Sequence, residues 1–368
     1  MVTDALNNRD RRIAIVTYTN NNLREIEKRF AELNSGIPKH VEVMTWFSFL
    51  LRECARPYQR SKFDEKRIES LLFVNKHSTQ GIPECQTKKY YIAGEDFIYS
   101  DKISRFVVEC EEKSSMAVTS RLKRIYTDIF VDEFQDLAGW DFEVVQMLMR
   151  SGISVTLVGD PRQHIYSTHP SPKNKKYIGI GFVDLAKTWN RKGVCSVEHM
   201  NATYRCNGLI CDFSNGLWPN MDAMTPLRND TIDHQGVYLV AESLIKDYVD
   251  RFKPQVLRHD KRANTYGQEA LNFGVAKGLE FERVLIIPTK PIKKYLATGI
   301  IDHAIKSRDR LHVAVTRAWH SVAFVFDGHS PIVSNRWNSE ADNRYGKVPS
   351  LKEVIPALGQ SQRSTDIA

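Results

Sequence analysis

The sequence has no long hydrophobic stretch. None of its 368 residues lies in a run of about 18 apolar residues, which a membrane-spanning helix would need. The first residues, MVTDALNNRDRR, also lack the apolar core of a secretory signal. We therefore expect a chain that has no contact with a membrane and works in the cytoplasm.

Cysteine is scarce, with six residues scattered along the chain and no CxxC pair. This spacing argues against the common zinc sites and favours reduced thiols. Hydrophobic residues make up 42% of the chain, which is typical of a globular protein with a core. The length allows two or three domains, and the formal net charge of +8 is a mild indication of a polyanionic partner.

A glycine-rich phosphate loop is missing as well. The 368 residues contain no GxxxxGK(S/T) pattern, whose backbone amides and lysine hold nucleotide phosphates. The run YGKV, which begins at Tyr345, has neither the first glycine nor a preceding strand, and it lies in a polar segment. A phosphate site built on this loop is therefore not encoded in these residues.

What the sequence does contain is a series of short apolar runs rich in β-branched residues. They lie at 13–19, 128–133, 154–160, 237–242, 283–288 and 321–327, and helical patterns separate them. Apolar strands that alternate with amphipathic helices are typical of parallel sheets covered on both faces. We therefore predict an α/β fold with two parallel-sheet domains in tandem.

Composition divides the chain further. Residues 55–125 are rich in charge and predict a small helical insertion in the first domain. Residues 329–368 are polar, with Gly, Ser and Asn, which predicts a loosely attached tail. The predicted boundaries are 1–185 for the first domain, 186–328 for the second and 329–368 for the tail.

The run IFVDEFQD ends a predicted buried strand on a cluster of carboxylates. Open parallel sheets bind ligands at the carboxyl ends of their strands. One carboxylate, Asp132, is enough to hold a Mg²⁺ ion that keeps most of its waters, and Glu133 can orient or deprotonate an attacking water. The alternative is a solvated turn, which the letters DE alone would favour but the whole strand with DEFQD does not. Asp136 has no assigned role.

Another predicted strand ends in GDPRQHIY, residues 159–166. Asp160 follows the strand, and Gln163 can hydrogen-bond a γ-phosphate or its attacking water. Tyr166 offers a face for base stacking, with a core tyrosine as the alternative reading.

Two arginines and a glycine-containing turn complete the candidates. Arg205 in TYRCN and Arg317 in VAVTRAW suit developing phosphoryl charge because a guanidinium is forked and permanently charged. Singly, each would be read as a surface arginine. Between them, AKGLEF supplies Gly278, which permits close backbone approach, and Glu280, which can accept from a ribose hydroxyl.

Taken in order, these motifs resemble those of superfamily 1A helicases of the UvrD/Rep/PcrA type. VDEFQD resembles the Walker B motif, GDPRQHIY motif III, TYR motif IV, AKGLEF motif V, VAVTRA motif VI and TYTNNNLREIEKR motif Ia, and MTWFSFLLR resembles the DNA-contacting segment after motif Ia. The resemblance covers residues 13 to 327. It implies two RecA-like P-loop NTPase domains with ATP and Mg²⁺ between them, in an ATP-dependent single-stranded DNA translocase or 3'-5' helicase.

The resemblance also implies residue roles. Asp132 would hold the metal, Glu133 would be the catalytic base, Gln163 would sense the γ-phosphate, and Arg205 and Arg317 would be arginine fingers. Nucleotide contacts would come from Asp160, Gly278 and Glu280, and single-stranded DNA contacts from Tyr18, Asn20, Thr45 and Tyr166. Compact relatives serve as partners of nucleases in anti-phage systems such as Gabija, so a nuclease subunit is a further expected partner.

The chain departs from this family at several points. The Walker A segment and its strand, an interior strand in the family, are missing upstream of motif Ia, so we expect an N-terminally incomplete chain with weak or no ATPase activity. MVTDALNN would then be the last turns of the helix after the loop, and an in-frame stop immediately upstream would refute this. Gly274 and Phe47 stand where histidines are common, and STHPSPKNKKY replaces a stacking aromatic. The segment from Arg205 to Lys277 is too short for a 2B domain.

Two other functions remain open. A non-hydrolysing DNA-binding or regulatory partner of the same fold would explain the missing lysine, but it would leave Glu133, Gln163 and the two arginines without a role. A metal nuclease would use Asp132, Glu133 and another acid. The lysine-bearing strand that such a nuclease needs is absent, because FQDLAGWDFEVVQ predicts loop and helix.

Overall fold

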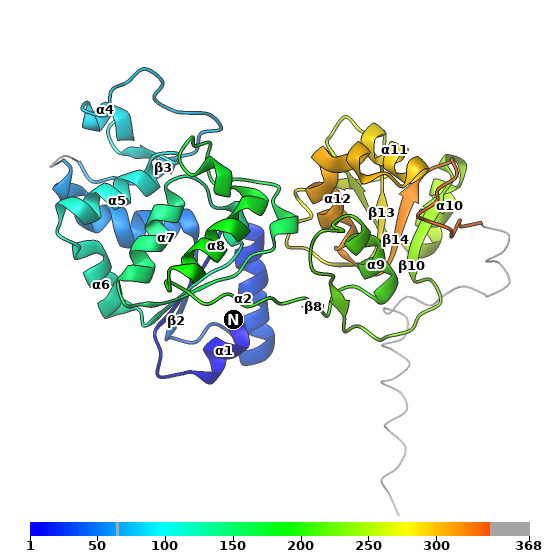
Figure 1. Ribbon diagram of the computed structural model, residues 1–368, viewed down its shortest axis with the longest axis horizontal. Coiled ribbons are helices and arrows are strands. Elements are labelled where there is room, and N and C mark those ends of the chain that lie inside the picture. The colour runs from blue at the N-terminus through cyan, green and yellow to red at the C-terminus, as the bar shows by residue number, and fades with distance from the viewer. Residues whose placement is uncertain (64–65, 339–368) are drawn as a thin grey trace, which may run out of the picture.

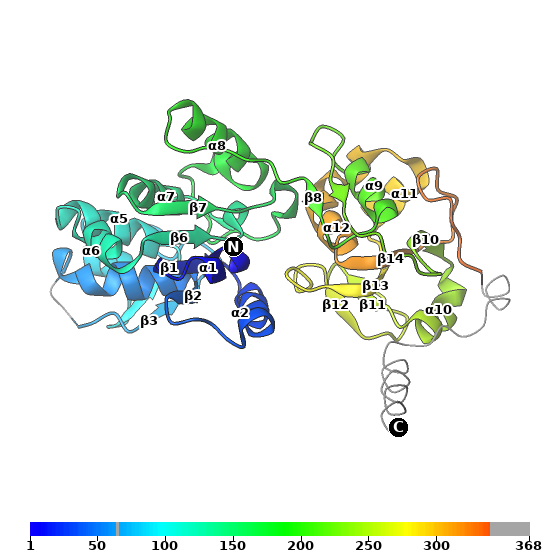
Figure 2. The same cartoon turned by 90° about the horizontal axis from the view of Figure 1, so that it is seen from below.

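Two lobes, each built on a parallel sheet, lie side by side in the computed structural model, which describes residues 1–63 and 66–338. An extended segment that leads through β8 (Ala202–Thr203) joins them (Figures 1 and 2). The strand β8 pairs with β9 (Thr225–Pro226). The α/β class with flanking helices is therefore confirmed, whereas the exact domain boundaries stay predictions.

The first sheet has the order β2 (Val41–Thr45), β1 (Ile13–Thr17), β6 (Asp128–Val131) and β7 (Ser154–Leu157). All three pairings are parallel. Alternate residues of β1 point to opposite faces, as strand geometry requires. Ile13 and Ile15 pack with α1 (Val2–Asn7) and α2 (Asn20–Asn34), whereas Ala14 and Val16 belong to a core that includes α7 (Asp141–Arg150). Both faces of β1 are therefore buried.

The strand β7 is an edge of this sheet. It pairs with β6 alone in the described chain, and its residues alternate between exposed and half-buried, unlike the fully buried β1 and β6. The strand β2 is the other edge of the four-stranded sheet in the described residues. The expected absence of a strand from this sheet stays a prediction.

The segment between β2 and β6 is mixed rather than purely helical, so the prediction of a helical insertion was only partly right. It contains α3 (Trp46–Phe49), α4 (Thr87–Tyr91), α5 (Ile103–Lys113) and α6 (Ala117–Ile125). It also contains a small sheet of β3 (Ser70–Leu72), β5 (Phe97–Tyr99) and β4 (Ile92–Ala93). The strands were missed because each has only two or three residues.

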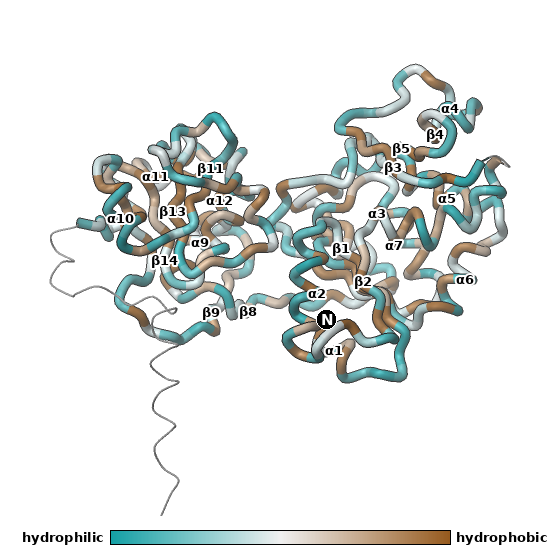
Figure 3. The backbone as a smooth tube through the Cα atoms, turned by 180° about the vertical axis from the view of Figure 1, so that it is seen from behind, coloured by the Kyte–Doolittle hydropathy of each residue, from teal (hydrophilic) through white to brown (hydrophobic). Residues whose placement is uncertain are grey.

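The second sheet is also parallel, in the order β10 (Gly236–Val240), β14 (Ala318–Val325), β13 (Phe281–Ile286), β11 (Gln255–Arg258) and β12 (Ala270–Asn272). One face packs against α9 (Gly208–Gly216), α11 (Lys290–Thr298) and α12 (Arg308–Val315). The helix α10 (Ile245–Phe252) covers the other face. Figure 3 shows the hydrophobic residues concentrated at the centre of each lobe.

The start of the predicted tail packs onto the second lobe. The amide of Leu239 donates to the carbonyl of Asn335 at 2.8 Å, the amide of Trp337 donates to Leu239 at 2.9 Å, and Trp337 is buried. The rest of the predicted tail, 339–368, lies outside the described residues. Across the described ranges, no helix combines the length and apolarity needed to cross a membrane.

Candidate functional site

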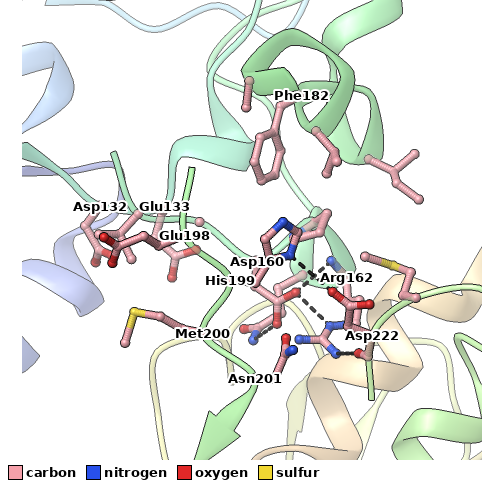
Figure 4. A pocket seen from close by; sticks show the side chains of 18 of the residues that line it. Asp132, Glu133, Asp160, Arg162, Phe182, Glu198, His199, Met200, Asn201 and Asp222 are labelled. Atoms are coloured by element: carbon pink, nitrogen blue, oxygen red, sulfur yellow. Dashed lines mark hydrogen bonds and ion pairs between the residues drawn. The ribbon is translucent and has the colours of Figure 1, made fainter. Parts of the chain in front are cut away.

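A cavity of about 900 Å³ lies between the two lobes. The first lobe contributes the carboxyl ends of β6 and β7 and the start of α8 (Phe182–Arg191), and the second contributes residues directly before β13 and β14. Figure 4 shows Asp132 and Glu133 on one side and Asp160 and Arg162 on the other, with linker residues Glu198 to Asn201 beside them. The cavity is thus placed where open parallel sheets bind ligands.

The structure brings most of the predicted site residues to this cavity. Its lining includes Asp132, Glu133, Asp160, Gln163, Arg205, Gly278, Glu280 and Arg317. The four predicted DNA contacts, Tyr18, Asn20, Thr45 and Tyr166, are not part of the lining. Residues far apart in the chain therefore meet as expected, while the role of each stays a prediction.

Glu133 is held in an unusual backbone conformation. Its φ of 57° and ψ of 40° lie in the left-handed region, which non-glycine residues rarely adopt. Oε1 accepts from Asn22 Nδ2 at 2.6 Å, and Oε2 accepts from Gln135 Nε2 and lies 3.0 Å from Lys277 Nζ. Burial alone would raise the pKa of Glu133, but Lys277 and the amide donors outweigh it, so the pKa is lowered. In this conformation both carboxylate oxygens are engaged.

Lys277 crosses from the second lobe into this acidic cluster. It precedes β13, its side chain is only 2% exposed, and its ammonium donates to Asp136 Oδ2 at 2.6 Å. Burial alone would lower the pKa of Lys277, but the charges of Glu133 and Asp136 raise it. The lysine is therefore a buried cation between two carboxylates, and Asp136 acquires a role that the sequence did not reveal.

Asp132 differs from its neighbour. It has no ion-pair partner in residues 1–63 and 66–338, and it lines the cavity. Burial and the charge of Glu133 raise the pKa of Asp132 to about 7. No group of three or more His, Cys, Asp or Glu side chains is arranged to hold a metal in this described part. A cation here would rely on Asp132 and water, which is compatible with Mg²⁺ because that ion keeps several waters.

Gln163 makes hydrogen bonds to residues of both lobes. Its Nε2 donates to Asp160 at 2.8 Å, while its Oε1 accepts from Arg317 of the second lobe at 3.2 Å. Arg317 is buried and also donates to the carbonyls of Val313 and Leu279. Burial lowers the pKa of Arg317, with the charge of Arg205 acting in the same direction. The guanidinium is thus held at the cavity with little freedom to reorient.

The second lobe places a further ion pair at the cavity. Arg205 Nε donates to Glu280 Oε1 at 2.7 Å, and Trp319 Nε1 donates to Oε2 at 3.0 Å. Gly278 adopts a φ of +83°, and a Cβ there would lie 2.4 Å from Asn22 Oδ1 of the first lobe. Glycine is therefore required both by the backbone and by the close approach of the lobes.

The four predicted DNA contacts lie outside the lining of the cavity. The Tyr18 hydroxyl donates to the Ser167 carbonyl at 3.3 Å, Asn20 begins α2, and Thr45 caps α3 by accepting from the amide of Ser48. Tyr166 is 39% exposed, and a Cβ at Gly274 would lie 2.0 Å from its hydroxyl oxygen. Tyr166 thus occupies the space that any larger side chain at position 274 would need.

Four residues of the site were not predicted from the sequence. Asn22 and Gln135 bind Glu133, Lys277 bridges two acids, and His312 of α12 points Nε2 at Asp160 over 3.8 Å. Asn22, Gln135 and Lys277 stood in recognised motifs, but nothing in those motifs showed their partners. The contact of Lys277 with Asp136, 141 residues earlier, also depends on how the two lobes meet, which a single sequence does not report.

Comparisons with known proteins find similarity to helicases. The family model described as UvrD/REP helicase N-terminal domain matches residues 99–170. The ATP-dependent DNA helicase Rep of Buchnera aphidicola subsp. Acyrthosiphon pisum (strain APS) is 28% identical over 108 residues, which is 29% of this chain and 15% of that protein.

Solved structures of viral helicases are also similar. The PRRSV helicase matches with 14% identity and a TM-score of 0.36, over 88% of this chain and 54% of that chain. Arterivirus nonstructural protein 10 (helicase) in a complex with DNA matches with 13% identity and a TM-score of 0.35, over 88% of this chain and 56% of that chain. The chain therefore spans about half the length of these structural relatives.

Proposed function

We propose that this chain is a UvrD-like superfamily 1 helicase that binds ATP with Mg²⁺ in the cavity between its lobes. Its motifs and its match to UvrD/REP and Rep proteins support this proposal. Hydrolysis there would drive movement along single-stranded DNA in the 3'-5' direction. We propose a cytoplasmic location on the same ground. A nuclease partner stays a prediction, because no observed contact supports it.

The observation that carries this proposal is the set of charges facing one cavity from two lobes. Asp132 and Glu133 come from the first lobe, and Arg205 and Arg317 from the second. Acids and arginines on opposite sides of one cavity suit a ligand that brings both a divalent cation and phosphates. A site of this kind also links the ligand to the relative position of the lobes.

Each side chain has a task that its geometry supports. Asp132 faces the cavity, has no ion-pair partner among the described residues and fits an ion that keeps its waters, while Mg²⁺ would supply charge neutralisation to the phosphates. Glu133 would position or deprotonate a water once its donors withdraw. Gln163 is held between Asp160 and Arg317, so it can report a change at the phosphates to the second lobe. Arg205, paired with Glu280 at the cavity wall, would turn to phosphate.

A non-hydrolysing DNA-binding partner is the second candidate. It is favoured by one observation: both oxygens of Glu133 accept from protein donors, and Lys277 neutralises the cluster that would handle water. Together with the missing GxxxxGK(S/T) pattern, this predicts weak ATP hydrolysis by the 368 residues themselves.

The test compares nucleotide binding by the wild type and Arg205→Ala with a fluorescent ATP analogue and Mg²⁺. We expect Arg205→Ala to weaken binding about tenfold, because a charged hydrogen bond is worth roughly 1.5–3 kcal/mol. Arg228→Ala is the matched control, since Arg228 stacks on Trp319 in the same lobe but does not line the cavity. Equal nucleotide affinity of the two variants would show that ATP does not bind in this cavity.

ATP turnover separates the two candidates. A dT oligonucleotide should raise turnover in an ATP-driven translocase, and Glu133→Gln should abolish the increase while nucleotide binding persists. Glu282→Gln, on an exposed part of β13, is the control. Nucleotide binding with no rise in turnover on addition of DNA would favour the non-hydrolysing partner instead.

A further inference from the structure

Three aromatic rings form a chain across the first lobe, away from the cavity. The Tyr18 and Phe47 ring centroids are 6.2 Å apart, and those of Phe47 and Phe73 are 5.2 Å apart with planes at 87°. The rings come from three places: the end of β1, the helix α3 and the residue after β3. The chain therefore leads from a predicted DNA contact, Tyr18, onto the insertion.

Phe73 is the exposed end of this chain. Its side chain is 68% exposed, whereas Phe47 is 5% exposed and belongs to the core. Leaving a Phe in water forgoes roughly 1.5–3 kcal/mol of burial, which a partner that covers this ring could recover. Perpendicular packing on Phe47 fixes the ring while leaving most of its surface open.

The charges beside Phe73 favour a polyanion. Asn75, Lys76 and His77 follow it and are all exposed, and residues 70–80 contain no Asp or Glu. Asp101 binds Ser78 of this segment but is buried, so the exposed charges that follow Phe73 in the sequence are cationic. An exposed aromatic ring followed by an exposed lysine suits a nucleic-acid strand, in which bases stack and phosphates carry the charge. An apolar protein partner would gain nothing from Lys76.

We propose that Phe73 is a base-stacking residue for single-stranded DNA, which extends the strand's path from Tyr18 and Thr45 onto the insertion, with Lys76 at the adjacent phosphate. This inference rests on the proposed DNA binding and adds a contact that no motif of the chain contains. It also supplies a stacking ring in a chain whose segment after Tyr166, STHPSPKNKKY, offers none before Tyr177.

The test measures binding of a dT oligonucleotide by fluorescence anisotropy for the wild type, Phe73→Leu and Phe73→Tyr. Leucine keeps an apolar contact with Phe47 but cannot stack, so we expect at least about fivefold weaker binding, from the roughly 1–3 kcal/mol of one stacked base. Tyrosine should restore wild-type affinity. Phe97→Leu is the matched control, because Phe97 is 44% exposed on β5 of the same small sheet.

A spectroscopic readout locates the base. 2-Aminopurine placed at successive positions of the oligonucleotide should be quenched at one position near the end of the bound stretch, and Phe73→Leu should restore emission at that position alone. Lys76→Ala should reduce the salt dependence of binding by about one phosphate contact.

The outcomes separate this inference from the function on which it rests. If the wild type binds no single-stranded DNA, the proposed function fails and the inference fails with it. If the wild type binds but Phe73→Leu matches it, only the inference is wrong. Equal losses in Phe73→Leu and Phe97→Leu would trace the effect to the fold of the insertion and would also overturn it.

Discussion

The buried side chain of His312 shows how one residue can make the fold sensitive to pH. Its Nδ1 contacts Ser214 Oγ at 2.9 Å, while Nε2 has no hydrogen-bond partner in the described chain and lies 3.8 Å from Asp160. Burial lowers the pKa of His312, and Asp160 only partly opposes this shift. Arg162 and Arg317 are nearby cations that act in the same direction as burial. The imidazole is therefore neutral in the folded protein.

We predict that the contribution of His312 to the free energy of unfolding falls between pH 7 and pH 5, whereas Asp132 and Asp136, whose pKa values burial raises to about 7, act in the opposite direction. The unfolded histidine takes up a proton near its ordinary pKa of about 6.5, whereas folded His312 stays neutral to lower pH, so acid favours the unfolded chain. His164 and His320 also have lowered pKa values and add to the slope. His312→Gln should change the difference in unfolding free energy between pH 7 and pH 5 by roughly 1 kcal/mol, in the direction of less loss in acid, as measured by urea unfolding at each pH.

His329→Gln is the control, because that side chain is exposed. A slope that is unchanged in His312→Gln would mean that His312 is protonated in the folded protein. Asp160 affects the free energy of unfolding at a lower pH than this range. Burial alone would raise its pKa, but His312 and Arg162 lower it strongly, so its stabilising effect is lost only in much stronger acid.

At the scale of elements, one carboxylate ties the insertion to the first sheet. Asp141, at the start of α7, is fully buried and accepts from the amide of Ala138 at 3.1 Å and from Trp46 Nε1 at 2.9 Å. It also accepts from the hydroxyls of Ser104 on α5 and Thr168. All four partners are donors, so the site requires an acceptor on both oxygens.

Asp141→Asn should therefore destabilise the first lobe by about 3 kcal/mol. An amide group would turn its own N–H donors toward one of the two N–H donors, Trp46 Nε1 or the Ala138 amide, and leave that donor buried and unsatisfied at roughly 1–3 kcal/mol. The remaining hydrogen bonds would also lose their charged acceptor. Thermal unfolding measures the loss, and Asp184→Asn on α8 serves as the control, since Asp184 lies at the wall of the cavity outside this core. A loss of less than about 1 kcal/mol would show that the network relaxes around the amide.

Elements were predictable where their apolar pattern is continuous. The strands β1, β6, β7, β10, β13 and β14 were all predicted, with ends that differ by a few residues. The strands β2, β11 and β12 were missed, because VEVMT alternates with polar residues and QVLR and ALN are short. The acids and Gln163 were found because they follow predicted strands, and the arginines because they stand in motifs. The contacts of Asn22 with Glu133 and of Lys277 with Glu133 and Asp136 had no local signal, because each joins segments far apart in the sequence.

At the scale of the molecule, the lobes meet through a few polar contacts. Asn21 Nδ2 donates to the Val275 carbonyl at 3.4 Å, Arg162 to the Asp222 carbonyl at 3.5 Å, and Arg317 to Gln163 at 3.2 Å. Interfaces of this kind normally allow the domains to move relative to each other. Lys277 also joins the lobes through buried ion pairs with Glu133 and Asp136, where removing one partner would leave a buried charge unpaired.

Lys277→Met should therefore change both stability and shape. It leaves Glu133 and Asp136 buried without their cation, which costs roughly 3–5 kcal/mol when one partner of a buried pair is removed. The lobes should separate in response, because opening the cavity rehydrates both acids. We expect a larger radius of gyration in small-angle X-ray scattering and faster proteolysis of the linker at 192–201.

Two comparisons sharpen this prediction. Lys293→Met removes an exposed ion pair with Glu242 within the second lobe, so it should cost less than about 1 kcal/mol and leave the shape unchanged. Asp136→Asn combined with Lys277→Met should lower the free energy of unfolding by less than the sum of the two single changes, because each change alone already breaks the same ion pair. Mg²⁺ should stabilise Lys277→Met more than the wild type, because the acids no longer have an ammonium competing with the ion. If Mg²⁺ stabilises both proteins equally, Lys277 does not control access of cations to this cluster.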